Sequence, residues 1–168
     1  MKRSLIAVGL LIAVCSGLVL AQAPAVGTKT DPIIGTWKLN PEKSNPKPSP
    51  GTVSVRRYEL RPDGFMTTII VGVTPQGDPS FTQTTWKYDG KDYPQYTQGS
   101  LAELSAKGVK PGTDASRAID AYTSELTQKD NTGKVTFAGR TRVVSKDGKT
   151  LTIKGQAANT VAVYDRVH

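Results

Sequence analysis

Gly35-Thr36-Trp37 is the stretch that decides the fold, because it opens a long series of short strand-forming runs. Nine runs rich in Val, Ile, Thr and Tyr are separated by Gly, Asp and Pro turns. They are Thr36–Asn40, Thr52–Leu60, Phe65–Val73, Phe81–Tyr88, Ala115–Ile119, Tyr122–Gln128, Val135–Val144, Thr150–Gly155 and Thr160–Val167. This spacing predicts an all-β chain, an antiparallel barrel or sandwich. Gly35-Thr36-Trp37 favours the barrel, as a first strand whose Trp37 indole fills one end, and we expect an up-and-down barrel of eight to ten strands.

The residues ahead of this series have the pattern of an export signal. Lys2 and Arg3 precede an apolar run over residues 5–20, and small residues surround a cleavage site after Ala21. A retained anchor is the alternative, because the run approaches the ~20 residues that span a bilayer. The sequence therefore predicts a signal peptide over residues 1–21 and a periplasmic or extracellular protein without stable membrane insertion after cleavage.

Cys15 is the single cysteine and lies inside the predicted leader. Ile12-Ala13-Val14-Cys15 is similar to a lipoprotein cleavage motif, which makes lipid anchoring through Cys15 an alternative localisation. If the leader is removed, the mature chain has no cysteine. A thiol nucleophile, a disulfide framework and a cysteine zinc site are then excluded.

The mature chain is predicted to be one domain with a mildly basic surface. Without the leader about 147 of the 168 residues remain, which suits a single core. Residues 22–32 read as a flexible tail and residues 33–168 as the barrel. Two of the net +8 charges belong to the leader, and the other basic residues are scattered, which argues against nucleic-acid binding.

One hairpin is expected around the loop 61–65, which contains Asp63-Gly64. A three-residue loop pairs Leu60 with Met66 and places two apolar sets on opposite faces. One set is Val53, Val55, Ile69, Val71 and Val73, and the other is Tyr58, Leu60, Met66 and Ile70. A strand pair that is apolar on both faces either has other residues covering its second face or helps to line an internal cavity.

A second hairpin is expected around Asp147-Gly148. A three-residue loop over residues 146–148 pairs Val143 with Leu151, and this register also pairs Thr141 with Ile153 and Gly139 with Gly155. It assigns Leu151 and Ile153 to the core face. The opposite face, which carries Val144, Arg142 and Arg140, is predicted to meet water.

One segment departs from the strand pattern. Ser100-Leu101-Ala102-Glu103 reads as a capping box, and Gly108 ends the helix-forming residues that follow. The sequence predicts one short helix, which either lies over a barrel mouth or decorates a loop.

Four stretches of the sequence together resemble one protein family. They are Gly35–Ser44, Tyr88–Pro94, Val144–Thr152 and Val163–Arg166. In this order they resemble the signature sequences of exported bacterial lipocalin-like proteins, over about residues 33–167. The resemblance implies a barrel with an internal pocket, and it implies that Arg166 packs on Trp37 at the closed end as a structural pair.

Aromatic residues supply the candidate ligand site. Trp86 and Tyr88 alternate along one strand and form either a pocket wall or ordinary core. With Tyr58, Ile69 and Val71 they make up the predicted ligand-binding set.

The sequence offers few catalytic groups, and the chain is predicted not to be an enzyme. Its single histidine is His168, the last residue, which leaves no histidine base inside the fold. Asp120 and Glu125 could pair as carboxylates, but such pairs arise by chance. The aspartates of Gly-containing turns, Asp89, Asp92, Asp130 and Asp147, suit turn chemistry. No metal and no cofactor is predicted.

The function predicted from the sequence is an exported, non-enzymatic protein that holds a small, largely apolar ligand inside its barrel. The alternative is a surface interaction or inhibitor module. In that case side chains fill the barrel, and loops at 45–51, 74–80 and 95–113 bind an envelope protein or polymer. The ligand and the oligomeric state are left open.

Overall fold

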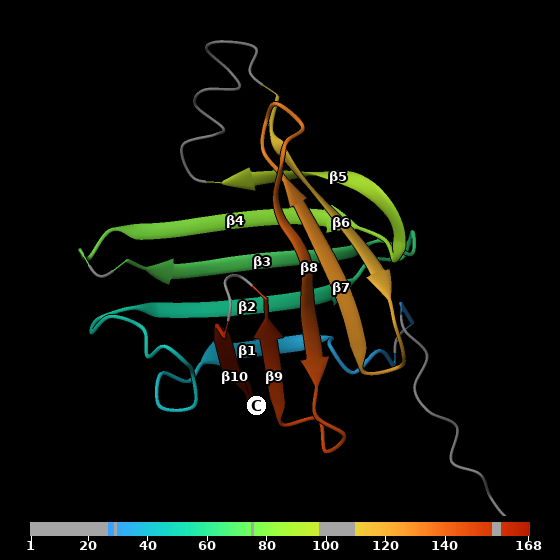
Figure 1. Ribbon diagram of the computed structural model, residues 1–168. Helices are drawn as coiled ribbons and strands as arrows, with labels where there is room; N and C mark the ends of the chain where they lie inside the picture. The colour runs from blue at the N-terminus through green and yellow to red at the C-terminus, as the bar shows by residue number, and fades with distance from the viewer. Residues whose placement is uncertain (1–26, 29, 75, 98–109, 156–158) are drawn as a thin grey trace, which may run out of the picture.

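The structure is a computed structural model that describes residues 27–28, 30–74, 76–97, 110–155 and 159–168. These residues form one closed antiparallel barrel in which each strand pairs with its neighbours along the chain and β1 pairs with β10 (Figure 1). The strands are β1 (Gly35–Leu39), β2 (Val53–Leu60), β3 (Met66–Val73), β4 (Pro79–Trp86), β5 (Asp89–Thr97), β6 (Gly112–Ala118), β7 (Thr123–Lys129), β8 (Val135–Val144), β9 (Thr150–Lys154) and β10 (Val161–Val167). The predicted all-β class and the antiparallel barrel are confirmed.

Two sequence predictions fall on residues outside this description. They are the leader over residues 1–21 and the short helix over residues 100–107. The described residues contain no helix, and hence none that is long and apolar enough to cross a membrane.

The barrel is flattened into two layers that cross at a steep angle. Strands β1–β5 form one layer and β6–β10 the other, and β5 curves round one side to join them (Figure 1). The register of β5 against β6 shifts between Asp89 and Asp92, an irregularity of the kind that bends a strand. The side chains between the layers form the interior.

Strand β5 is the strand that the sequence pattern misses. It begins with Asp89-Gly90, which was predicted to lie in a turn, and contains Pro94, a residue that is rare inside paired strands. Pro94 is tolerated because β4 pairs with β5 only from Gln95 to Thr97, so the missing N–H of the proline removes no bond to β4.

The β2–β3 hairpin has the predicted register, with Leu60 opposite Met66 and Val55 opposite Val71. Its two apolar faces are not equivalent. Tyr58 and Met66 are 1% and 2% exposed, whereas Val71 is 43% exposed. The Tyr58 face therefore lines the interior and the valine face lies on the outside of the barrel.

The β8–β9 hairpin corrects the prediction. The backbone N–H of Ser145 donates to the carbonyl of Thr150, so the loop has four residues rather than three. Val144 is then opposite Leu151, and Arg142 is opposite Ile153. A slip of one residue exchanges the two faces of a strand. The predicted water face of β8 is thus the interior face.

The closed end of the barrel holds the main hydrophobic cluster. Its buried members are Ile33, Trp37, Tyr58, Met66, Trp86, Val144, Leu151, Ile153 and Tyr164. The Trp37 indole is fully buried, and its Nε1 donates to the Ile33 carbonyl at 2.8 Å. Cζ of Arg166 lies 4.1 Å from the Trp37 ring centroid, so the predicted contact is present. The Arg166 guanidinium also donates to the carbonyls of Ile34 and Pro32.

The end of the predicted flexible tail belongs to this closed end. Asp31 is buried, and its carboxylate accepts the N–H groups of Gly27 and Ile33 at 2.7 and 2.9 Å. Because these bonds and the contact of Ile33 with Trp37 fix the segment, the packed structure begins before residue 33.

Candidate functional site

A cavity of about 50 Å³ lies between the two layers, above the hydrophobic cluster. Most of its lining is polar. The lining residues are Arg56, Tyr58, Thr68, Ile70, Thr84, Trp86, Gln95, Asp114, Ser116, Leu126, Gln128, Arg140, Arg142 and Ile153. The interior therefore differs from the apolar one that the sequence pattern suggested.

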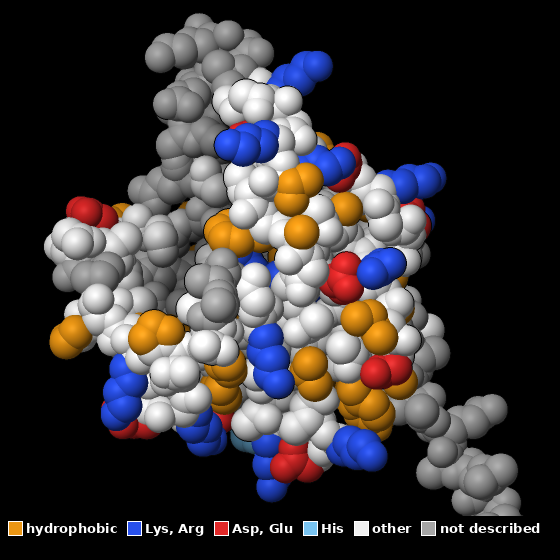
Figure 2. All heavy atoms as spheres, viewed as in Figure 1, with side chains coloured by type: hydrophobic (Ala, Val, Ile, Leu, Met, Phe, Trp, Pro, Cys, Tyr) orange, Lys and Arg blue, Asp and Glu red, His pale blue; other side chains and the backbone are white. Residues whose placement is uncertain are grey.

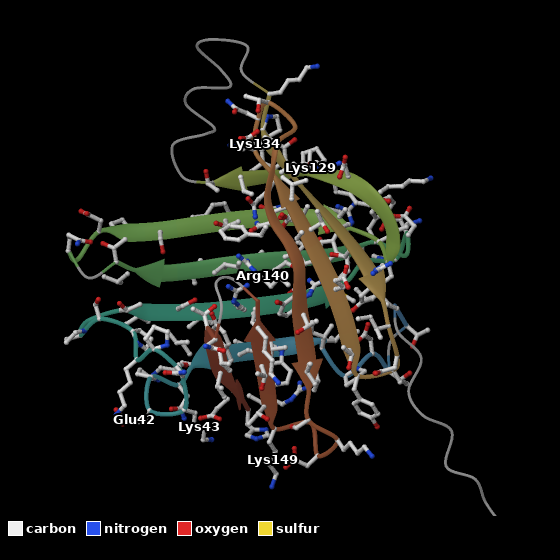
Figure 3. All side chains as sticks on the ribbon, viewed as in Figure 1. Glu42, Lys43, Lys129, Lys134, Arg140 and Lys149 are labelled. Atoms are coloured by element: carbon white, nitrogen blue, oxygen red, sulfur yellow. The ribbon has the colours of Figure 1, made fainter. Side chains whose placement is uncertain are left out.

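A bulge in β8 places the Phe137 ring beside Arg140, which alternation along β8 from Val144 and Arg142 directs into this cavity. Leu126 pairs with Arg140 and Gln128 pairs with Phe137, so two residues of β8 lie opposite one of β7. One of those two is Gly139, which has a φ of 69°. Because of the extra residue, Phe137 and Arg140 share a face, and Cζ of Arg140 lies 4.4 Å from the Phe137 ring centroid. Figure 3 shows Arg140 beside β8, where this strand crosses β2 and β3 in the view.

Two further arginines enter from opposite walls. Arg142, two residues along β8, has its Cζ 4.5 Å from the Trp86 ring centroid, and its Nη2 donates to Oγ of Ser116 at 2.8 Å. Arg56 comes from β2 in the other layer, with its Cζ 5.0 Å from the Tyr164 ring centroid. Each guanidinium thus lies against an aromatic ring, a favourable contact for a buried cation.

Asp114 of β6 is the single carboxylate among the described residues of the lining. Its Oδ2 accepts hydrogen bonds from Oγ1 of Thr84 at 3.2 Å and Nε2 of Gln95 at 3.1 Å. Burial raises the pKa of Asp114, although the bond from Thr84 and the charges of Arg142 and Arg140 act in the opposite direction.

The buried arginines respond to each other and to their surroundings. Burial lowers the pKa of Arg140, and the nearby charge of Arg56 lowers it further. For Arg56, burial lowers the pKa, but the adjacent Tyr164 and Tyr58 raise it by more. A guanidinium stays protonated in a protein, so all three remain cations.

Several buried polar atoms of the cavity have no hydrogen-bond partner among the described residues. They are Nε of Arg56, Nε and Nη2 of Arg140, Nε of Arg142, the hydroxyl of Tyr58 and Oδ1 of Asp114. Buried polar groups are nearly always paired with protein or water, so such a group is a reason to look for a missing partner.

The structure places the five predicted ligand residues in three different surroundings. Trp86 and Tyr58 line the cavity. Tyr88 packs edge-on against Trp86, with ring centroids 4.8 Å apart, and faces the closed end, where burial and the charge of Asp31 raise its pKa. Ile69 and Val71 lie on the other face of β3 from Thr68 and Ile70, outside the barrel.

The arginines were missed because their charge was taken to mean exposure. The signal that could have revealed them is Val144, an apolar residue that shares a face of β8 with Arg142 and Arg140 through alternation along the strand. A four-residue loop would have set Val144 opposite Leu151, and the arginines would have followed it inward.

The carboxylates named in the sequence analysis are engaged in turns and ion pairs. Asp120 accepts the N–H of Tyr122 in the β6–β7 turn, whereas Glu125 pairs with Arg117 at 3.1 Å. Asp92 lies in β5 and pairs with Lys129 rather than serving a turn. Turn bonds hold Asp89, Asp130 and Asp147. Across the described residues, no group of three His, Cys, Asp or Glu side chains is placed to hold a metal ion.

The outer surface offers no comparable concentration of charge on the face drawn in Figure 2, where basic and acidic side chains are interspersed. The cavity is therefore the strongest candidate site in the described part of the chain. Comparison with protein-family models, with curated proteins and with solved structures finds no match to this chain.

Proposed function

We propose that this protein binds a small molecule and holds a polar part of it inside the barrel. The observation that carries the proposal is the set of unpartnered buried atoms around the 50 Å³ cavity. A cavity needs about 10–15 Å³ to hold a water, so this one accommodates a few waters or one small polar group. The lining favours such a group over the largely apolar ligand expected from the sequence.

The proposal keeps two expectations from the sequence. The leader pattern supports an exported protein, in the periplasm or outside the cell, and the order of signature stretches supports a lipocalin-like barrel that binds its ligand without chemical change. Both remain proposals about this chain. Lipid anchoring through Cys15 is the alternative mode of localisation.

Native mass spectrometry tests the proposal. The protein is purified from its own source and measured under native and denaturing conditions. We expect a reproducible extra mass that denaturation releases, and the released compound identifies the ligand class. A ligand at 100 times its Kd should also raise the unfolding free energy by about 2.7 kcal/mol.

The opposite outcome favours the alternative function. If the native mass equals that of the bare chain and a library of small metabolites leaves Tm unchanged, the cavity holds only water. The outer surface and the loops at 45–51, 74–80 and 95–113 would then be the place to search for a partner.

A further inference from the structure

The inference below rests on the proposed function and concerns the chemical class of the ligand. Among the described residues, no carboxylate oxygen lies within 4.0 Å of a guanidinium nitrogen of Arg56, Arg140 or Arg142. Arg140 and Arg142 are 7% and 5% exposed, so water at the surface solvates them poorly. An unpaired buried charge is among the costliest features a fold can contain.

Asp114 does not neutralise the cluster. It is one carboxylate against three guanidiniums, and its Oδ2 is bound to Thr84 and Gln95 instead of to an arginine. The formal charge of the lining is therefore +2 when Asp114 is ionised. A ligand group with one or two negative charges would balance it.

The rings contact the arginines through their faces, and part of the polar edge of each guanidinium is left without a partner among the described residues. These rings are those of Phe137, Trp86 and Tyr164. A planar guanidinium held in this way directs its N–H groups sideways, and these match the paired oxygens of a carboxylate or a phosphate. The unpartnered Nε and Nη2 of Arg140 are two such donors from one side chain.

We propose that the ligand is an oxyanion whose carboxylate or phosphate group is bound by Arg140, Arg142 and Arg56. The cavity volume of about 50 Å³ suits the acidic group itself. Arg140 and Arg142 come from β8 and Arg56 from β2, so the group is held between the two layers of the barrel.

Calorimetric titration of the purified full chain, first freed of any bound compound by unfolding and refolding, tests this inference. The probes are inorganic phosphate, acetate and glycerol, in a chloride buffer of constant ionic strength. We expect one of the two oxyanions to bind, and the stronger one shows whether the site prefers a phosphate or a carboxylate. Glycerol, which is small, polar and neutral, should not bind measurably.

Variants locate the binding. Arg140→Gln and Arg142→Gln should each weaken binding about tenfold or more, because a charge-assisted hydrogen bond is lost. Arg140→Lys keeps the charge without the fork and should give an intermediate loss. Arg57→Gln is the matched control, since Arg57 neighbours Arg56 on β2 but is exposed and pairs with Glu59. It should bind as the wild type does.

The outcomes separate this inference from the function on which it rests. Equal affinity in Arg140→Gln and wild type, or no preference for oxyanions over chloride, overturns the inference. If native mass spectrometry still shows a bound neutral compound, the proposed function stands and only the ligand class is wrong. A bare mass together with no oxyanion binding removes both.

Discussion

A guanidinium in a barrel interior changes how each neighbouring residue must be understood. Phe137, Trp86 and Tyr164 are aromatic residues whose faces contact cations, so they support the arginines as well as filling space. Their positions would be ordinary core positions if Arg140, Arg142 and Arg56 pointed outward. At this scale the cost of an unpaired charge gives a direct test that needs no ligand.

Replacing Arg140 by Met should stabilise the ligand-free protein. An apolar side chain of similar length removes the unpaired charge and can still pack on Phe137, so we expect the unfolding free energy to rise by about 1–3 kcal/mol. Urea unfolding measures it, with Arg57→Met as the exposed control, expected to change by no more than about 0.5 kcal/mol. A clear loss of stability in Arg140→Met would mean that the arginine serves the fold instead of a ligand.

Trp37→Ala tests the closed end. The substitution leaves a cavity beneath Arg166 and deprives the Ile33 carbonyl of its donor, so the unfolding free energy should fall by about 3–5 kcal/mol. Thermal and urea unfolding both report it. Tyr96→Ala, at a residue 37% exposed, should remain near wild type. An unchanged Tm in Trp37→Ala would contradict the structural role assigned to this residue.

At the scale of the element, turn length decided what the sequence could predict. The loop at Asp63-Gly64 has the expected length, so the register of β2 on β3 follows from it. The loop at Asp147-Gly148 is one residue longer than expected, and the same counting reversed the faces of β8. The difference lies in how Lys149 is used, as the last loop residue rather than the first strand residue, and the apolar Val144 opposite Leu151 is the one sign of that choice in the pattern of β8.

The bulge at Gly139 was beyond sequence reasoning for a related reason. Period-two alternation puts Phe137 and Arg140 on opposite faces, and only an inserted residue with positive φ brings them together. The candidate site was thus predictable in its aromatic part, at Trp86 and Tyr58. Its charged part depends on the register of β8 on β9, and the bulge adds the Phe137 ring beside Arg140.

Gly139→Ala should weaken oxyanion binding by more than its loss of stability explains. Its φ of 69° strains any residue with a Cβ, and a Cβ there would have no neighbour within 4 Å, so the cost comes from the backbone alone, about 1 kcal/mol. Gly133, with a φ of 87° and equally open surroundings, is the matched control. Both variants should lose similar stability in urea, but only Gly139→Ala should weaken oxyanion binding. Equal binding in the two would show that the Phe137 ring, which the bulge brings to Arg140, does not help to position this arginine.

The whole molecule should lose stability in acid. Asp63 and Asp120 accept backbone N–H groups from Phe65 and Tyr122 in hairpin turns, and these bonds hold their pKa values below the usual 3.8. Such groups stabilise the fold above their unfolded pKa and lose that contribution as pH falls through the folded one. Urea unfolding from about pH 6 to about pH 2 should show a fall that starts near pH 4. Asp63→Asn should make it shallower.

Asp114 should partly offset this loss of stability in acid. Its pKa is raised by burial, so it takes up a proton on folding, and its contribution to stability grows as pH falls through its folded pKa. Asp114→Asn removes this offset and should lose stability more steeply than wild type over the same pH range. A shallower fall in that variant would place the pKa of Asp114 below, not above, its ordinary value.

The pairing of β1 with β10 also governs when the molecule can fold. Trp37 meets Arg166 across a separation of 129 positions in the chain, so the seam of the barrel forms between strands made at very different times. Until β10 has been synthesised, β1 has one unpaired edge and Trp37 has no guanidinium above it. Strands that are this distant in sequence pair slowly, and until they pair, their unpaired edges can associate with other chains. A truncation that removes only β10 should therefore leave a chain whose nine remaining strands aggregate instead of closing.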